Sequence, residues 1–270
     1  MVSRRLALMF ATIGLAGLLS PAGAQDAEDL AKQLSNPIAS LISVPFQFNY
    51  DQRIGPVEDG QKAYLNFQPV VPVSLNSEWN LISRTIVPVV SQDDIVPTGG
   101  SQLGLGDTVQ SFFFSPKKPG AGNIIWGAGP VLLVPTGTEP LLSSEKWGAG
   151  PTAVVLTQQG GWTIGILANH LWSYAGAPDR AEVNSTFMQP FVSYTTKDAW
   201  TYTLNTESTY DWTAEEWSVP LNFVVSKLIT IDKQPISLGA GIRYWADSPD
   251  GGPEGIGGRA VLTFLFPTGK

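Results

Sequence analysis

The sequence predicts an all-β fold, a transmembrane antiparallel β-barrel of about 12 strands. The barrel is expected to follow a cleaved signal peptide and a short N-terminal helix. Three observations support this prediction. Long segments alternate between apolar and polar residues, the connections alternate between short and long, and no long apolar helix follows the signal peptide. A chain that spans a membrane without such helices must do so as a closed barrel.

The segment from Trp200 to Trp212 carries the strongest signal. Its even positions hold every large apolar side chain and its odd positions are polar, which is the period of a strand with one apolar face. Its rings lie near the two ends. Such a strand runs roughly 40 Å, and a tilt of about 45° reduces its rise to roughly 28 Å, close to the hydrocarbon thickness of a bilayer. Aromatic rings favour the two borders of that layer.

The segment from Trp162 to Tyr174 repeats the pattern, although Leu167 and Leu171 fall on its otherwise small or polar face. Two such strands make a chance pattern improbable. The residues predicted to form an aromatic girdle are Trp162, Trp172, Tyr174, Trp200, Tyr202, Tyr210 and Trp212.

The first 24 residues have the organisation of a secretory signal peptide. Arg4 and Arg5 precede the apolar run 6–19, and the small residues 22–24 form a cleavage site. The mature chain is therefore expected to begin at Gln25. Losing the two arginines leaves 14 basic and 23 acidic residues, a formal net charge of −9.

Composition excludes several classes of function. The chain has no cysteine and a single histidine, so disulfides, thiolate metal sites and histidine-rich metal clusters are excluded. The acidic balance argues against nucleic acid as a partner. Gly104-Leu105-Gly106 is too short for a nucleotide loop. We therefore predict no metal, cofactor or catalytic site.

Residues 25–41 are predicted to form a periplasmic segment before the barrel, which occupies 42–270. Leu30 and Leu34 are one helical turn apart, and Pro37 should break the helix. This segment could be a lead-in, a plug at the barrel mouth or a frayed terminus.

The remainder reads as strand after strand, with turns on one rim and longer, acidic loops on the other, as in outer-membrane barrels. The predicted strands are 42–54, 62–75, 78–91, 105–115, 122–134, 146–157, 162–175, 182–196, 199–212, 216–231, 235–247 and 256–267. Several prolines lie inside them, and a closed barrel has no edge where a missing donor is harmless. Bulges or strand ends are therefore predicted at Pro69, Pro72, Pro88, Pro130, Pro151, Pro190 and Pro220.

Charged side chains on the polar faces would line the lumen and select polar or charged solutes. The same residues could instead pair with each other and fill a narrow interior, so an open and a plugged lumen both remain. The lumen candidates are Asp51, Arg53, Arg84, Glu207, Arg243 and Arg259.

Four stretches resemble a bacterial outer-membrane family: 34–45, Phe67-Gln68-Pro69-Val70-Val71-Pro72, 79–86 and Gly104-Leu105-Gly106-Asp107. This family is linked to meta-pathway phenol degradation and is described as a transporter. The resemblance covers nearly the whole mature chain. It implies a barrel in the outer membrane of a Gram-negative bacterium and an aromatic or otherwise hydrophobic solute.

The predicted function is a channel for passive uptake of a small molecule, with outer-membrane lipid and that solute as its partners. One rival is a structural barrel without a transport role, and another is a soluble periplasmic β-sandwich. A lipid hydrolase would need His170 as its base. However, His170 falls on the predicted lipid face beside Trp172, and no Gly-x-Ser-x-Gly motif occurs.

Overall fold

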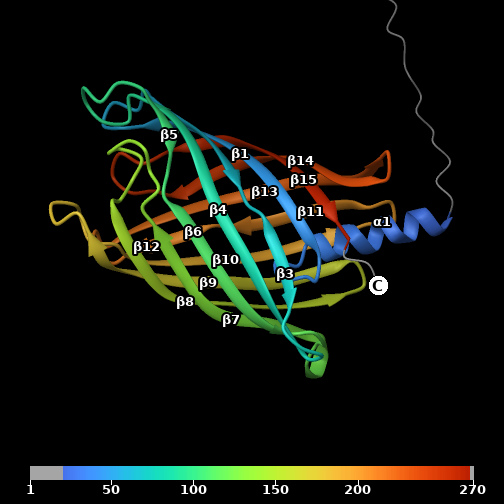
Figure 1. The fold of residues 1–270 in the computed structure, drawn as a ribbon. Coiled ribbons are helices and arrows are strands. Elements are labelled where there is room, and N and C mark those ends of the chain that lie inside the picture. Colours follow the sequence, from blue (N-terminus) through green and yellow to red (C-terminus); the bar gives the residue numbers. More distant parts are fainter. Residues whose placement is uncertain (1–20, 268–270) are drawn as a thin grey trace, which may run out of the picture.

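A computed structural model of the protein describes residues 21–267 (Figure 1). Most of the predicted signal peptide therefore lies outside the described residues. The chain begins with the helix α1 (Pro21–Leu34) and continues as 15 strand segments in one sheet. No helix within 21–267 is both long and apolar enough to cross a bilayer.

The strand segments follow one another around the sheet in chain order, and every pairing is antiparallel. They are β1 (Ile42–Ile54), β2 (Gly60–Phe67), β3 (Val70–Ser74), β4 (Trp79–Asp93), β5 (Gln102–Leu105), β6 (Thr108–Pro116), β7 (Ile124–Val134), β8 (Lys146–Gln159), β9 (Trp162–Gly176), β10 (Asn184–Thr195), β11 (Trp200–Thr206), β12 (Ser208–Asp211), β13 (Glu216–Ile231), β14 (Gln234–Asp247) and β15 (Gly255–Phe266). A short 3₁₀ turn, Ala121–Asn123, precedes β7. Pairing of β15 with β1 leaves no free edge.

Three pairs of segments are single barrel strands with a local interruption, so the barrel has 12 strands, as predicted. β2 and β3 keep one register against β4, and β11 and β12 keep one register against β10 and β13. β5 and β6 both pair with β4, with a shift of one residue between them. The predicted number and direction of strands are confirmed.

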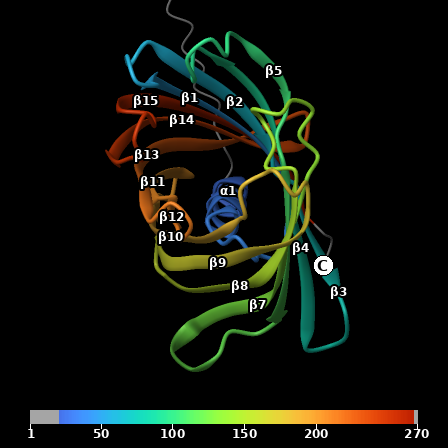
Figure 2. The same ribbon diagram turned by 90° about the vertical axis from the view of Figure 1, so that its left-hand side faces the viewer.

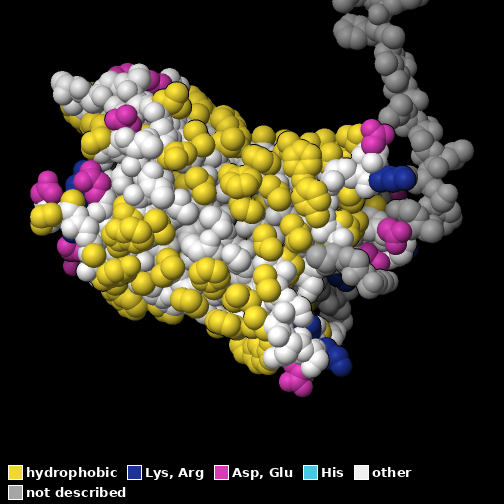
Figure 3. All heavy atoms as spheres, viewed as in Figure 1, with side chains coloured by type: hydrophobic (Ala, Val, Ile, Leu, Met, Phe, Trp, Pro, Cys, Tyr) yellow, Lys and Arg dark blue, Asp and Glu magenta, His cyan; other side chains and the backbone are white. Residues whose placement is uncertain are grey.

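The outer surface carries a broad apolar band, and charged side chains gather at its two ends (Figure 3). Ile164, Leu204, Phe223 and Ile242, which belong to four different strands, are all exposed. Burying such a surface requires hydrocarbon, because exposed apolar patches of this extent are rare on soluble proteins. The soluble β-sandwich is therefore excluded, since the fold is one closed cylinder.

Aromatic side chains lie at both borders of this band. All the predicted girdle residues except Tyr210 are exposed, with Trp162 and Trp200 at one end and Trp172 and Trp212 at the other. Tyr210 is half-buried, and its ring contacts Trp212 and the neighbouring Trp217.

The two ends of the barrel differ. Short turns lie at one end, which we call the turn end, together with the start of β1 and the finish of β15. Asp232 and Lys233 form a two-residue turn at this end and have positive φ at both positions, as a hairpin of type I′ requires. The other end, which we call the loop end, carries the longest connections, 94–101 and 135–145, together with 55–59, 177–183, 212–215 and 248–254.

The proline prediction is correct at two positions. Pro69 lies between β2 and β3, and Pro220 adjoins a register shift in β13. The other five prolines lie inside continuous strands, so the predicted bulges or ends are wrong for Pro72, Pro88, Pro130, Pro151 and Pro190.

The barrel accommodates these five prolines by interrupting the adjacent ladder. Pro130 of β7 and Pro151 of β8 face each other. The β6–β7 and β8–β9 ladders each lack residue pairs at these prolines, and the register is the same on both sides of the gap. Pro88 faces the β5–β6 interruption, and Pro190 faces the β11–β12 interruption. Pro72 pairs with β4 on one side, and on its other side β3 has already passed the start of β1. The missing donor therefore faces a gap in each case.

The C-terminal part of the helix α1 lies in the mouth of the barrel at the turn end, and its N-terminal part projects beyond the rim (Figure 1 and Figure 2). Ala31 lies in the helix and Leu41 lies just before β1. Both pack against Ala199, Leu228 and Leu265 of the barrel. Gln158 in β8 donates to the carbonyl of Lys32 at 2.8 Å. The chain then turns at 35–41 and enters β1.

Candidate functional site

Four charged side chains meet inside the barrel between its two ends. Arg259 donates to both carboxylate oxygens of Glu207, at 2.9 and 2.7 Å. Arg243 lies 3.2 Å from Glu207 through Nη1 and 3.1 Å from Asp51 through Nε. We call Asp51, Glu207, Arg243 and Arg259 the charge cluster. Its two bases and two acids balance, and all except Glu207 are nearly fully buried.

Neutral side chains complete the charge cluster. Trp245 Nε1 donates to Asp51 at 2.9 Å. Its ring also lies against the Arg243 guanidinium, whose central carbon is 4.7 Å from the ring centroid of Trp245. Asn49 accepts from Arg259 Nε at 2.8 Å. Buried charges need this degree of pairing to offset their desolvation.

Register brings the cluster together. Asn49 pairs with Arg259 across β1 and β15, and Gly241 pairs with Arg259 across β14 and β15. Glu207 reaches the cluster from the interruption between β11 and β12. The prolines opposite explain that interruption, because the register places Pro190 opposite Thr206 and Pro220 opposite Glu207.

A cavity of about 530 Å³ lies on the loop-end side of the cluster, and we call it the loop-end cavity. Asp51, Arg243 and Trp245 form part of its lining, together with Lys62 and Tyr64 of β2. Residues of three connections line it as well: Ile95, Leu142 and 249–253.

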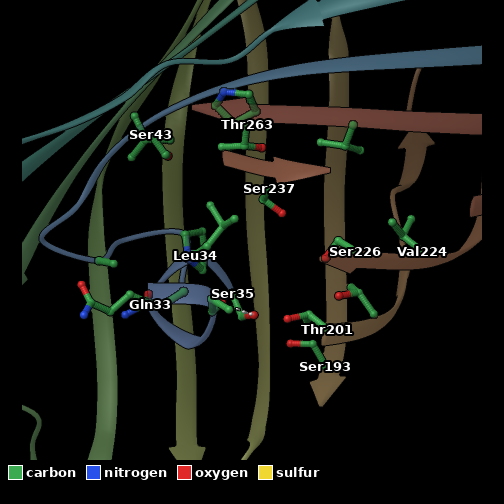
Figure 4. Close-up of a pocket in the computed structure, with 18 of the residues that line it drawn as sticks. Gln33, Leu34, Ser35, Ser43, Ser193, Thr201, Val224, Ser226, Ser237 and Thr263 are labelled. Atoms are coloured by element: carbon green, nitrogen blue, oxygen red, sulfur yellow. Dashed lines mark hydrogen bonds between the residues drawn. The ribbon is translucent and has the colours of Figure 1, made fainter. Parts of the chain in front are cut away.

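A second cavity, of about 270 Å³, lies at the turn end between α1 and the wall, and we call it the turn-end cavity. Hydroxyl groups of Ser193, Thr201, Ser226, Ser237 and Thr263 project from the wall around it, opposite the end of the helix (Figure 4). Its apolar lining includes Leu34, Val70, Phe191, Val224 and Val261. Its charged lining residues are Arg84 and Arg259.

Two further lumen cations stand beside the cluster without a carboxylate. Arg84 donates to the buried Gln68 at 3.1 Å, and Lys62 lies 6.0 Å from the ring centroid of Tyr64. Neither forms an ion pair with any carboxylate among residues 25–267.

Arg53 lies apart from the lumen residues. Its side chain is half exposed at the loop end, where it pairs with Glu58 and Glu254. Simple alternation places it inward, but its φ of 57° and a register shift between Gln52 and Ile54 turn it toward the rim. The sequence interpretation of Arg53 as a lumen residue is corrected accordingly.

Asp107 accepts four hydrogen bonds from loop 135–145, a role that its sequence context did not predict. Its Oδ1 accepts from Gly137 N and Ser143 Oγ at 3.1 and 2.7 Å, and its Oδ2 accepts from the amide and hydroxyl of Ser144, both at 2.6 Å. These bonds fasten loop 135–145 over the interruption between β5 and β6, beside the loop-end cavity. The sequence gives only a weak signal for this contact: Asp107 follows Gly104-Leu105-Gly106, and the pair Ser143-Ser144 lies far along the chain.

We predict that Asp107→Asn loosens loop 135–145 while the barrel stays folded. An amide cannot accept the two bonds from Ser144, and charge-assisted bonds contribute about 1.5–3 kcal/mol each. A glutamyl endopeptidase should therefore cut after Glu139 or Glu145 at least about tenfold faster. Asp179→Asn, on an exposed neighbouring loop, is the matched control. Equal cleavage of both variants would contradict the role of Asp107.

Loop 177–183 is held by another pair at the rim. Lys146 is almost fully buried and lies 2.7 Å from Glu182, which also accepts from Ser173. The hydrogen bond from Lys146 lowers the pKa of Glu182 below its ordinary value, and the bond from Ser173 acts in the same direction. The contact is therefore lost only when the pH falls below that ordinary range.

His170 lies on the outer face near the loop end. Its Nδ1 is 2.7 Å from Thr186 Oγ1, and its ring centroid is 4.0 Å from that of Trp172. Trp212 Nε1 donates to the same hydroxyl at 2.8 Å. Among the described residues its hydrogen-bond partners include no serine and no carboxylate, so the geometry is that of a girdle residue.

Comparison with solved structures identifies the architecture. A crystal structure of an outer membrane channel from Pseudomonas putida F1 superposes with a TM-score of 0.66, covering 84% of this chain and 96% of that chain at 13% identity. The protein has the fold of an outer-membrane β-barrel. The NanC porin matches at a TM-score of 0.49, 13% identity and coverage of 84% and 100%.

No family model and no curated protein matches the sequence. The link to phenol degradation therefore stays a resemblance. The fold, the apolar band and its aromatic borders together place the barrel in a Gram-negative outer membrane.

Proposed function

We propose that this barrel is a channel for passive uptake of a small solute. The observation that carries the proposal is the pair of lumen cavities on either side of the charge cluster. Entry at the loop end would lead through the loop-end cavity, past the cluster, into the turn-end cavity and out beside α1. Long loops face the exterior in barrels of this type, so the turn end would face the periplasm.

The proposed solute is small, with an aromatic or otherwise hydrophobic body. Two observations support this choice: the apolar part of the turn-end lining, and the sequence resemblance to the transporter family. Hydroxyl and amide groups alternate with the apolar side chains there, so a solute could exchange hydration for hydrogen bonds as it moves.

Movement would be diffusion down a concentration gradient. The solute meets a transverse field at the charge cluster, where the acids and bases face each other. Such a constriction selects by charge and size without consuming energy. The cluster would remain in place during passage, because its groups are bound to strands of the rigid wall.

Planar-bilayer recording of the purified, refolded chain tests the proposal. We expect discrete openings, smaller than those of a wide porin because the lumen is narrow. Entry of a small solute into liposomes that contain the protein, measured by their osmotic swelling, gives a second readout. A barrel that passes neither ions nor solute at any salt concentration or voltage would be structural, and the channel proposal would be wrong.

A further inference from the structure

The turn-end cavity differs in charge from the rest of the protein. The whole chain carries a formal net charge of −7, yet both charged residues in the lining of this cavity are arginines. No carboxylate among the described residues lines it. An acidic protein thus encloses a small basic compartment on the route assigned to its solute.

The two arginines differ in how many of their donors are used. Arg259 directs Nε to Asn49 and both terminal nitrogens to Glu207. Within residues 21–267, the guanidinium of Arg84 makes one hydrogen bond, from Nη2 to Gln68 at 3.1 Å. A guanidinium has five N–H donors, so most of those on Arg84 remain for another acceptor.

Gln68 positions Arg84. It is buried, its backbone N–H donates to Pro45 at 2.9 Å, and its side chain accepts from Arg84. This glutamine lies in the interruption between β2 and β3, beside Pro69, and Arg84 is on the adjacent β4. The guanidinium is therefore fixed before any ligand arrives, which lowers the entropic cost of binding.

The end of α1 does not cancel this positive charge. A helix C-terminus presents carbonyl oxygens, which favour cations. Here the carbonyls of Ala31 and Lys32 accept from Ser35 N, and the carbonyl of Lys32 also accepts from Gln158. These bonds occupy acceptors that would otherwise compete for Arg84.

We propose that the turn-end cavity binds the carboxylate group of a small organic anion, with Arg84 as its main partner. The planar guanidinium matches a carboxylate through two parallel bonds. Hydroxyls of Thr203 and Ser226 and the amide of Asn205 offer further polar partners in the lining, while Phe191 and Val224 accommodate an apolar body. The inference deepens the proposed function, since it names the chemical class of the solute, and it rests on that function for the transport step.

Binding can be tested without any transport. The refolded chain in detergent is titrated with benzoate and, separately, with the neutral analogue benzamide, by isothermal titration calorimetry. We expect benzoate to bind more tightly than benzamide, and Arg84→Gln to weaken benzoate by about tenfold or more, the usual worth of a charge-assisted pair. Arg84→Lys keeps the positive charge but loses the two parallel N–H donors of the guanidinium, so an intermediate affinity for benzoate is expected.

The matched control is Lys118→Gln, which makes the same change of charge on an exposed turn. It should leave benzoate affinity unchanged. Heat-modifiable migration on a gel shows whether each variant has folded. Equal affinities for benzoate and benzamide, or equal losses in the Arg84 and Lys118 variants, would overturn the carboxylate site.

Reversal potentials across a salt gradient separate this inference from the proposed function. A conducting channel should prefer anions, and Arg84→Gln should reduce that preference while Lys118→Gln should not. A conducting channel that prefers cations would overturn the anion site but leave the channel. A closed barrel that still binds benzoate through Arg84 would overturn the channel but support the site.

Discussion

Deleting residues 25–41 should convert the barrel into a wider and more steadily conducting pore. The helix α1 lies within the turn-end mouth, and the turn-end cavity is the space left between it and the wall. All strands begin at or after Ile42, so the wall itself should still close. We expect single-channel conductance to rise several-fold, because the segment that narrows the mouth is gone.

A point substitution separates loss of the plug from loss of stability. Ile38 packs in the lumen against Ile82 and Phe113, so the deletion also removes core contacts. Ala31→Glu places a charge in the contact between α1 and the wall, where the residue is 4% exposed, and should expel the helix alone. The matched control is Gln25→Glu, which adds the same charge at an exposed position of the helix.

Bilayer recording of these variants gives the answer. Conductance should rise in the deletion and in Ala31→Glu, and stay unchanged in Gln25→Glu. Unchanged conductance in both of the first two would mean that the helix does not restrict flow. Heat-modifiable migration should show that all three are folded.

Replacing Glu207 by Gln should cause the largest loss of stability of any single change in the lumen. Glu207 is the shared partner of Arg243 and Arg259. Removing one partner of a buried ion pair costs about 3–5 kcal/mol, because it leaves uncompensated charge. Glu207 retains 19% exposure, so a value near the lower limit, about 3 kcal/mol, is expected.

Urea unfolding in lipid vesicles, followed by tryptophan fluorescence, measures the change. Glu58→Gln is the matched control, because Glu58 pairs with Arg53 on the exposed rim and such pairs contribute little. The Glu207 variant should also shift reversal potentials toward anions, since the cluster then carries an excess of positive charge. Indistinguishable unfolding of the two variants would contradict the structural role of the cluster.

Much of the fold could be predicted because the outside of the barrel faces one uniform medium. Each strand must present apolar side chains to it at every second position, as 162–174 and 200–212 do. That requirement acts on each strand separately, so it can be recognised one strand at a time. The number of strands follows from counting these segments and their turns, and the structure confirms it.

The arrangement inside the barrel could not be predicted in the same way. Polarity at alternate positions selected Asp51, Glu207, Arg243 and Arg259, but their partners depend on register between strands far apart in sequence. Arg53 has the same alternation as Asp51, yet one local shift turns it to the rim. No periodicity reveals the bonds from loop 135–145 to Asp107.

The sequence by itself determined that this chain forms a barrel with an apolar belt and aromatic borders, because burial in hydrocarbon acts on each strand independently. Only the tertiary structure decided which charges meet, where α1 lies and which arginine keeps free donors. Those features depend on closure of the sheet and on the register of every strand, and closure brings together residues, such as Asn49 and Arg259, from opposite ends of the chain.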